Sequence, residues 1–384
     1  MIASPFRRSC CVLAPLLPVA VAAAMFYSRA LAFHHLLAAG TLAALLVAFA
    51  APALRWRRFA LSAAALGGAW GVIEVVLARA PDRVHATFQD APGGFRLVDQ
   101  PRVGYAARPN GWRRHQSWAG TQLLYEVTYQ MDEHGWRRGP DLAAVDAPRA
   151  VVFLGCSFTF GVGLEDAETL PAQFERAAGG AVRTYNVAMD GYGPHQLLAL
   201  FEQDRVKPVL GRHERMAGLH LAIPNHVLRV AGAARWGFQG PCYRLQPDGT
   251  VRYTGPFHRK GMAAVLHLAA RSHVLSEIHD RVRRVTERDL DRHAAVVAAL
   301  QAEFQQQFNG PFMVLAWDTG DAGYVEMVAR LRGRGLRVVE VSELVPGYVP
   351  GRADLMRPLD RHPTPACMRQ VADALIAAGL PPFD

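Results

Sequence analysis

The sequence predicts a three-layer α/β/α sandwich around a parallel sheet, preceded by transmembrane helices at the N-terminus. Two observations carry this prediction. Short apolar runs alternate with helical patterns from Ala150 onward, whereas residues 9–80 are dominated by Ala, Leu and Val. A chain of 384 residues is long enough for one large domain with an appendage.

Five apolar runs provide the predicted strands of the sheet. The first, Ala150–Leu154, is short and continuous and is followed by Gly155, which is typical of a strand buried on both faces. The other runs lie at 183–187, 218–223, 312–316 and 336–341, with helical periodicity at 167–178 and from about His195. Strands that alternate with helices indicate a parallel sheet with helices on both faces.

The segment between the apolar N-terminus and the sheet is predicted to be a β-rich connector. Residues 123–129 form a β-like run, and residues 134–139 have the composition of a turn. We therefore expect a membrane segment at 1–80, a connector at 81–147 and the sheet domain at 148–384.

The alternation of strands and helices is interrupted at about 237–300. Residues 240–253 have the pattern of a hairpin, with Pro247-Asp248-Gly249 as its turn, and residues 262–306 are helical in pattern. We interpret this stretch as an insertion in the sheet domain, or a cap near its site.

Three apolar stretches make up the predicted membrane segment: Cys10–Tyr27, Ala30–Leu54 and Phe59–Ala80. A transmembrane helix needs roughly 20 apolar residues, which the second and third stretches provide. The first is short and contains Pro15 and Pro18, so the core of a signal peptide is the alternative there. We favour a first span, because two more apolar stretches follow directly.

Positive charges decide the expected orientation, because cytoplasmic loops carry an excess of Lys and Arg. Arginines precede the first stretch and separate the second from the third: Arg7, Arg8, Arg55, Arg57 and Arg58. The link between the first two stretches has only Arg29. Three spans then place residues 81–384 outside the inner membrane, in the periplasm. Glu74, near the outer end of the third stretch, is expected to be a boundary residue rather than a proton relay.

Composition narrows the classes of partner and cofactor. The net charge is +9 with 42 Lys and Arg, but no stripe of basic residues alternates with aromatic ones, so nucleic acid is not an expected partner. No CxxC spacing and no His/Asp/Glu cluster with ligand spacing occurs, so no metal or other cofactor is expected. Cys242 and Cys367 could pair outside the cytoplasm, although we favour packed free thiols.

The segment Gly155-Cys156-Ser157-Phe158-Thr159-Phe160-Gly161 directly follows the first predicted strand. Ligands of open α/β sheets bind beyond the carboxyl ends of the strands, so Ser157 is expected on an exposed tight turn. Backbone N–H groups of such a turn can hold an oxyanion. The segment differs from the GxSxG elbow, because Thr159 stands where the last glycine would be. We expect Ser157 to be a nucleophile rather than a helix cap.

A serine hydroxyl needs a general base to attack at neutral pH. The candidate is His362, two residues after Asp360 and directly before Pro363. In an extended loop, residues i and i+2 point to the same side. Asp360 can then accept a hydrogen bond from one ring nitrogen and direct the other toward the serine.

Two segments after the second and third predicted strands provide candidate oxyanion donors. The Gly191 N–H is favoured over that of Gly193 in the second segment, and the side-chain amide of Asn225 is the candidate in the third. With the N–H of Ser157, three donors would then face a tetrahedral intermediate. The histidines near these segments, His195, His220 and His226, are expected to be structural or surface residues.

These segments resemble the four blocks of the SGNH (GDSL-like) hydrolase superfamily, which is named for its Ser, Gly, Asn and His. The matching residues, in block order, are Ser157, Gly191, Asn225, and Asp360 with His362. The resemblance covers roughly residues 148–380 and implies a flavodoxin-like α/β/α sandwich with metal-free ester or acyl chemistry.

The sequence departs from the family pattern at two positions. Cys156 and His226 stand where the family usually has Asp. Those carboxylates support the site and are neither nucleophile nor base, so no catalytic role is lost. A thiol nucleophile at Cys156 is disfavoured, because Ser157 holds the family position.

The leading functional expectation is a serine-dependent ester hydrolase, an acylesterase or deacetylase, with an acylated glycan or lipid as its extracytoplasmic substrate. One alternative is an O-acyltransferase that passes the acyl group to a sugar hydroxyl of an exported polysaccharide or cell-wall glycan. Another is a catalytically inactive binding module that kept the fold, which Cys156 and His226 would favour.

Overall fold

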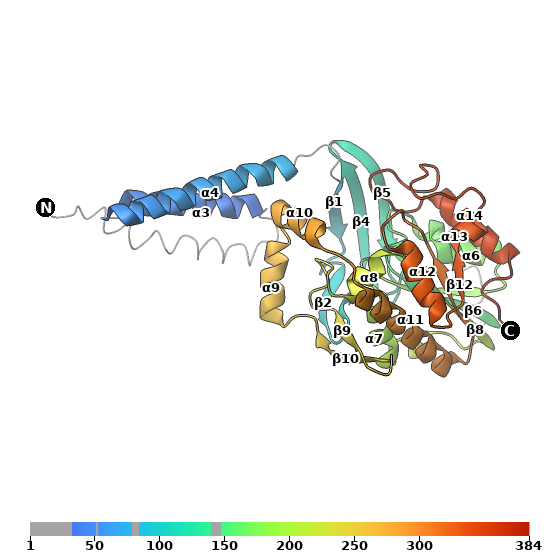
Figure 1. Ribbon diagram of the computed structural model, residues 1–384. Helices are drawn as coiled ribbons and strands as arrows, with labels where there is room; N and C mark the ends of the chain where they lie inside the picture. Colours follow the sequence, from blue (N-terminus) through green and yellow to red (C-terminus); the bar gives the residue numbers. More distant parts are fainter. Residues whose placement is uncertain (1–32, 51–52, 79–83, 140–146, 384) are drawn as a thin grey trace. The chain divides into compact units, whose positions relative to one another are not determined.

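The computed structural model describes residues 33–50, 53–78, 84–139 and 147–383. They form two compact units. One contains the described residues up to 78 together with residues 264–283, and the other contains the described residues from 84 to 263 and from 284 to 383. Figure 1 labels their helices and strands.

The larger unit contains a five-stranded parallel sheet with the order β12-β11-β8-β6-β7. Its strands are β6 (Arg149–Gly155), β7 (Arg183–Ala188), β8 (Arg215–Ala222), β11 (Phe312–Ala316) and β12 (Val338–Glu340). All five predicted runs are present, and β12 is shorter than its run of 336–341. The helix α13 (Val341–Leu344) begins at once and ends that strand.

Helices cover both faces of this sheet. Along β6, Val151 and Phe153 pack into one apolar core, and Val152 and Leu154 pack into another. The first core includes residues of α6 (Leu170–Ala177) and α14 (Pro365–Ala377), and the second includes residues of α7 (Pro194–Glu202), α11 (Glu287–Phe308) and α12 (Tyr324–Gly333). Two cores on opposite faces of buried strands confirm the predicted three-layer sandwich.

The strand order locates the edge at which a site is expected. The first strand, β6, lies between β7 and β8, so the chain turns to one side of β6 and then to the other. In a doubly wound sheet, ligands bind at the carboxyl ends of the two strands that flank this change of direction. Here these strands are β6 and β8, and they are followed by Ser157 and Asn225 respectively.

The predicted connector consists of strands that belong to the same unit as the sheet. An antiparallel sheet is made of β1 (Val84–Asp90), β4 (Trp112–Ala119) and β5 (Gln122–Gln130), and β2 (Arg96–Gln100) pairs with β3 (Gly104–Ala107). Its apolar residues share a core with the sandwich, where the ring of Tyr129 meets that of Phe160 edge-on at 5.2 Å between centroids.

The interruption at 237–300 contains the expected hairpin and helices. The hairpin is β9 (Pro241–Leu245) with β10 (Val251–Pro256), and it is followed by α9 (Lys260–Ala269), α10 (His273–Val282) and α11. The Thr286 side chain and the Asp289 side chain form a capping box at the start of α11.

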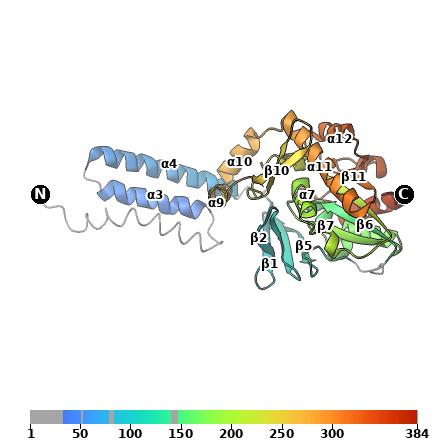
Figure 2. The same cartoon turned by 90° about the horizontal axis from the view of Figure 1, so that it is seen from below.

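The smaller unit contains α3 (Phe33–Ala50) and α4 (Leu54–Ala78), which lie side by side (Figures 1 and 2). Among the described residues, only α4 is long and apolar enough to cross a membrane, and α3 has a shorter apolar part at 37–48. The arginines expected in a loop, Arg55, Arg57 and Arg58, lie in the first turns of α4. The first predicted stretch, 10–27, lies outside the described residues.

Candidate active site

Ser157 begins a single helical turn directly beyond β6. This turn, α5 (Ser157–Phe160), ends at Gly161, whose φ of 85° is in the left-handed region that favours glycine. A Cβ on Gly155 would lie 2.1 Å from the Thr159 hydroxyl, so the strand can approach the turn closely only with glycine there. The expectation of an exposed serine is wrong, because Ser157 is buried, with only 4% of the residue exposed. Its hydroxyl lies 4.0 Å from the Cys156 sulfur.

His362 and Asp360 are paired in the loop that precedes α14. The Nδ1 atom of His362 lies 3.0 Å from an Asp360 carboxylate oxygen. Burial by itself would raise the pKa of Asp360, but the hydrogen bond with His362, the His362 charge and the Arg357 guanidinium outweigh it and lower that pKa. Asp360 is therefore ionised at neutral pH and favours the tautomer in which His362 Nδ1 carries the proton.

The backbone of this loop is held in a costly conformation. Leu359 and Arg361, on either side of Asp360, have φ values of 66° and 59°, which non-glycine residues adopt rarely. Each such residue costs on the order of 1–3 kcal/mol. The Arg361 guanidinium donates a hydrogen bond to the Thr319 carbonyl and pairs with Asp321 at 3.1 Å. The carboxylate and imidazole are thus presented by a loop of defined shape.

The histidine loop lies against the serine turn. The rings of Phe158 and His362 are 5.5 Å apart between centroids. The Arg357 guanidinium donates hydrogen bonds to the Pro363 carbonyl at 2.9 Å and to the Gly163 carbonyl at 2.6 Å. Arg357 therefore links the segment that carries His362 to the segment that follows Ser157.

The Gly191 segment, between β7 and α7, is held from outside the sheet. The Tyr105 hydroxyl donates to the Asp190 carbonyl at 2.8 Å, and the Trp236 indole N–H donates to the Gly191 carbonyl at 2.9 Å. Because a trans peptide points its N–H opposite to its carbonyl, Tyr105 also sets the direction of the Gly191 N–H. The rival glycine, Gly193, donates its own N–H to the Gln196 side chain at 3.1 Å.

A side chain at position 191 would not fit. The φ of Gly191 is 82°, and a Cβ would lie 2.5 Å from the Tyr105 hydroxyl and 2.6 Å from the Trp236 indole nitrogen. Glycine is therefore required here both by the backbone conformation and by the close approach of these two aromatic side chains.

Asn225 is the first residue of α8 (Asn225–Val230), directly beyond β8, and its side chain is partly exposed. The neighbouring His226 is fully buried, as are His195 and His220, so all three are structural rather than surface residues. The three expected oxyanion groups, at Ser157, Gly191 and Asn225, thus follow β6, β7 and β8 at one edge of the sheet.

Sequence reasoning missed the residues that the N-terminal strands bring to this region. Arg96 pairs with Asp190 at 2.7 Å, and its guanidinium lies over the Tyr105 ring at 5.1 Å. Burial lowers the pKa of His115 to about 4, against the opposing charges of Asp190 and Asp360. Isolated Arg, Tyr and His residues in a β-rich connector have no motif that would single them out, so only the tertiary contacts reveal them.

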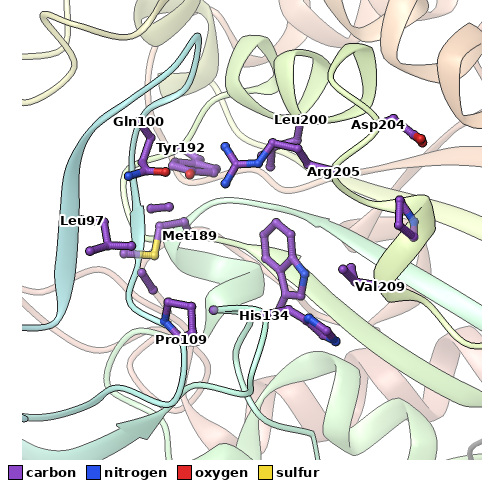
Figure 3. A pocket seen from close by; sticks show the side chains of 15 residues that line it. Leu97, Gln100, Pro109, His134, Met189, Tyr192, Leu200, Asp204, Arg205 and Val209 are labelled. Atoms are coloured by element: carbon purple, nitrogen blue, oxygen red, sulfur yellow. The ribbon is translucent and has the colours of Figure 1, made fainter.

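A cavity of about 310 Å³ lies beside the Gly191 segment (Figure 3). Its walls include Leu97 of β2 and Met189 and Tyr192, which flank Asp190 and Gly191. Figure 3 shows the Arg205 side chain extending toward Tyr192. Ser157, Asp360 and His362 do not line this cavity, so it is separate from the residues expected to do the chemistry.

No protein-family profile and no curated protein matches this sequence. Several solved structures are similar at low identity. A member of the lipolytic protein G-D-S-L family from Veillonella parvula DSM 2008 is 11% identical over 60% of this chain and 97% of its own, with a TM-score of 0.35. LAE5, an alpha/beta hydrolase enzyme from the metagenome of Lake Arreo, Spain, is 18% identical over 61% of this chain and 95% of its own, with a TM-score of 0.35.

A lipase from a goat rumen metagenome is 12% identical over 62% of this chain and all of its own, with a TM-score of 0.33. Likenesses this remote do not bear on activity or substrate. The topology of the chain itself is more informative, because the strand order is that of the fold implied by the four motif segments. Each of the first three segments also follows the strand after which it was expected, so this chain has the flavodoxin-like doubly wound α/β/α fold.

Proposed function

We propose that this chain is a membrane-anchored serine esterase that cleaves acyl esters outside the inner membrane. The observation that carries the proposal is the Asp360–His362 pair, held against the turn that begins at Ser157 at the carboxyl edge of β6 and β8. A serine, a histidine and an ionised carboxylate in this arrangement support covalent acyl transfer.

In the proposed reaction, the Ser157 hydroxyl oxygen attacks the acyl carbonyl carbon while Nε2 of His362 takes the hydroxyl proton. Asp360 stabilises the imidazolium that forms, because it accepts the hydrogen bond from Nδ1. His362 then gives the proton to the leaving alcohol oxygen as the C–O bond breaks. Water attacks the acyl-enzyme in the same way and releases the carboxylic acid and free Ser157.

The negative charge that develops on the carbonyl oxygen is assigned to the N–H groups of Ser157 and Gly191 and to the Asn225 side-chain amide. The bond from Gly193 to Gln196 supports Gly191 rather than Gly193 as the donor. The bond from Tyr105 supports a preset direction for that N–H. One oxyanion donor is typically worth about 3–4 kcal/mol of transition-state stabilisation, provided that it is preorganised.

We further propose that residues 1–80 anchor the protein by three membrane-spanning helices, with the connector at 81–147 and the hydrolase domain at 148–384 on the periplasmic side. The length and apolar composition of α4 support the anchor. The arginines at the start of α4 support a cytoplasmic position for that end of the helix. The segment 237–300 is then an insertion in the sequence of the hydrolase domain, and its residues 264–283 belong to the smaller unit.

The test is fluorophosphonate labelling of the full chain in detergent, comparing the parent with Ser157→Ala and His362→Ala. We expect labelling of the parent and its loss in both variants, because the reagent reports a serine activated by a base. Ser342→Ala and His134→Ala, at exposed positions, are matched controls that should label like the parent. A folded parent that does not label would overturn the proposal and favour an inactive binding module.

A further inference from the structure

The carboxylate of Glu74 on α4 is fully buried and accepts four hydrogen bonds. One comes from the Trp70 indole of the same helix at 3.0 Å. The other three come from the start of α10, namely from the Ser272 hydroxyl and from the backbone N–H groups of His273 at 2.7 Å and Val274 at 3.2 Å. Glu74 is therefore more than the boundary residue expected from the sequence.

These hydrogen bonds hold the start of α10 against α4. The first N–H groups of a helix have no partner within it, and a negative charge at that end is favourable for the helix dipole. Ser272 caps α10 by accepting from the Leu275 N–H at 3.0 Å, and Glu74 takes the N–H groups that remain. Because a buried carboxylate is costly unless its oxygens are hydrogen-bonded, the position of α10 on α4 is specific.

The attachment point is close to the end of the apolar helix. Glu74 precedes the last residue of α4, Ala78, by about 6 Å along the helix axis. A helix of 25 residues is about 37 Å long, which exceeds the hydrocarbon thickness of about 30 Å. If α4 crosses a membrane, Glu74 and the start of α10 therefore lie at the level of the lipid headgroups.

Apolar side chains of α9 and α10 in this unit are left exposed. The exposed fractions are 61% for Val265, 51% for Ile278 and 70% for Val282. The surrounding stretch, residues 259–284, contains six Arg and Lys residues and only two acidic ones. Exposed apolar residues on short helices with surrounding positive charge are typical of helices that lie in the interface of an anionic membrane.

We propose that α9 and α10 lie in the headgroup region of an anionic lipid surface, on the face of the membrane where α4 ends. This inference rests on the membrane anchor of the proposed function. A second copy of the chain is a less suitable occupant of the same surface, because two such basic stretches would repel each other. The protein would then contact the membrane through α9 and α10 as well as through α4.

The test uses the full chain in phosphatidylcholine vesicles with and without phosphatidylglycerol. Cys10, Cys11 and Cys242 are replaced by Ser, which leaves the buried Cys156 and Cys367. An environment-sensitive fluorophore is then attached to Ile278→Cys or Val282→Cys. The matched control is Val325→Cys on α12, an apolar residue that is 74% exposed in the other unit. Lipids with a nitroxide on the acyl chain serve as quenchers.

Labels at positions 278 and 282 should show blue-shifted emission and lose most of their fluorescence to the nitroxide lipid, and more so with phosphatidylglycerol. The label at 325 should show neither effect. Emission at 278 and 282 like that at 325 would overturn the inference. A blue shift without nitroxide quenching would also overturn it, because a protein partner would then cover the helices.

Alkaline carbonate extraction of the same vesicles separates this inference from the proposed anchor. Release of the chain would refute the anchor itself, whereas a retained chain with water-exposed labels would refute only the seating of α9 and α10. Glu74→Ala should keep the chain membrane-bound but reduce quenching at both positions. Quenching equal to that of the parent would show that the Glu74 hydrogen bonds do not hold α9 and α10 in the headgroup region.

Discussion

At the scale of single residues, Tyr105 controls the geometry of the candidate oxyanion donor without belonging to any motif. Burial raises the pKa of its hydroxyl, which therefore remains protonated and donates to the Asp190 carbonyl at 2.8 Å. We describe Tyr105 as a positioning residue, because it acts on the reaction through the Gly191 N–H.

Tyr105→Phe is expected to lower kcat by about tenfold with little change in KM, because the Gly191 peptide loses its orientation while substrate contacts remain. The ring is kept, so the folded state should lose only about 1 kcal/mol for the buried hydrogen bond. Steady-state kinetics with a chromogenic ester would measure this.

Tyr243→Phe is the matched control, since the Tyr243 hydroxyl is also buried and donates at 2.6 Å, in this case to Glu202. It should cost at least as much stability, because its partner is a carboxylate, but it should leave kcat unchanged. Equal kcat values for the two variants would show that the Tyr105 bond has only a structural role.

At the scale of elements, the site depends on how the loop before α14 is joined to the turn after β6. Arg357 links the two segments, because its guanidinium donates hydrogen bonds to the Gly163 and Pro363 carbonyls. The guanidinium also lies 5.0 Å from the Tyr125 ring centroid. The guanidinium can serve two carbonyls at once because it presents several donors in a fixed plane.

Arg357→Met is expected to reduce the rate of fluorophosphonate labelling by about tenfold, because the His362 loop is no longer held against the Ser157 turn. Arg357→Lys keeps the charge but not the planar pair of donors, and should recover only part of the rate. Full recovery with Lys would show that the charge, rather than the two hydrogen bonds, matters. Labelling rates of the three proteins at one pH make the comparison.

At the scale of the whole molecule, four buried histidines join the sheet to its helices. His220 of β8 stacks on His226 of α8 at 5.6 Å between ring centroids, and His293 of α11 lies 6.4 Å from His226. His195 of α7 is equally buried. Neither ring nitrogen of His226 or His293 has a hydrogen-bond partner in the described part of the chain. These rings are therefore packed as neutral core residues.

This packing predicts loss of stability in acid. Burial lowers the pKa of His195 and His293 to about 3 and that of His220 to about 4, and it holds the pKa of His226 well below 6.5. Between pH 6.5 and about 4 the unfolded chain binds protons that the folded chain excludes, so the free energy of unfolding falls as the pH falls. Above pH 6.5 these groups contribute no pH dependence.

Each histidine should steepen the dependence of the free energy of unfolding on pH by up to about 1.4 kcal/mol per pH unit. Urea unfolding of the full chain at pH 7.5, 6 and 5 would measure the slope. His293→Leu, which removes one of these groups, should give a shallower slope than the parent, whereas the exposed His134→Ala should not. An unchanged slope in His293→Leu would refute the explanation.

The sheet, its helices and the order of the motif segments can all be predicted from the amino-acid sequence. These features are local: a continuous apolar run, a helical period or a serine after a strand is written in a few neighbouring residues. Because the carboxyl ends of parallel strands meet at one edge of a sheet, the sequence also predicts that Ser157, Gly191 and Asn225 lie near one another there.

The contacts that hold these residues in position depend on the tertiary structure. Tyr105 and the Asp190 carbonyl are 85 residues apart in the chain, Arg357 and the Gly163 carbonyl are 194 apart, and Glu74 and Ser272 are 198 apart. Each contact is a hydrogen bond between groups that no local pattern pairs. The partner of each group depends on how distant elements pack. A buried donor or acceptor needs a hydrogen-bond partner, and the tertiary fold determines which group lies close enough to be that partner.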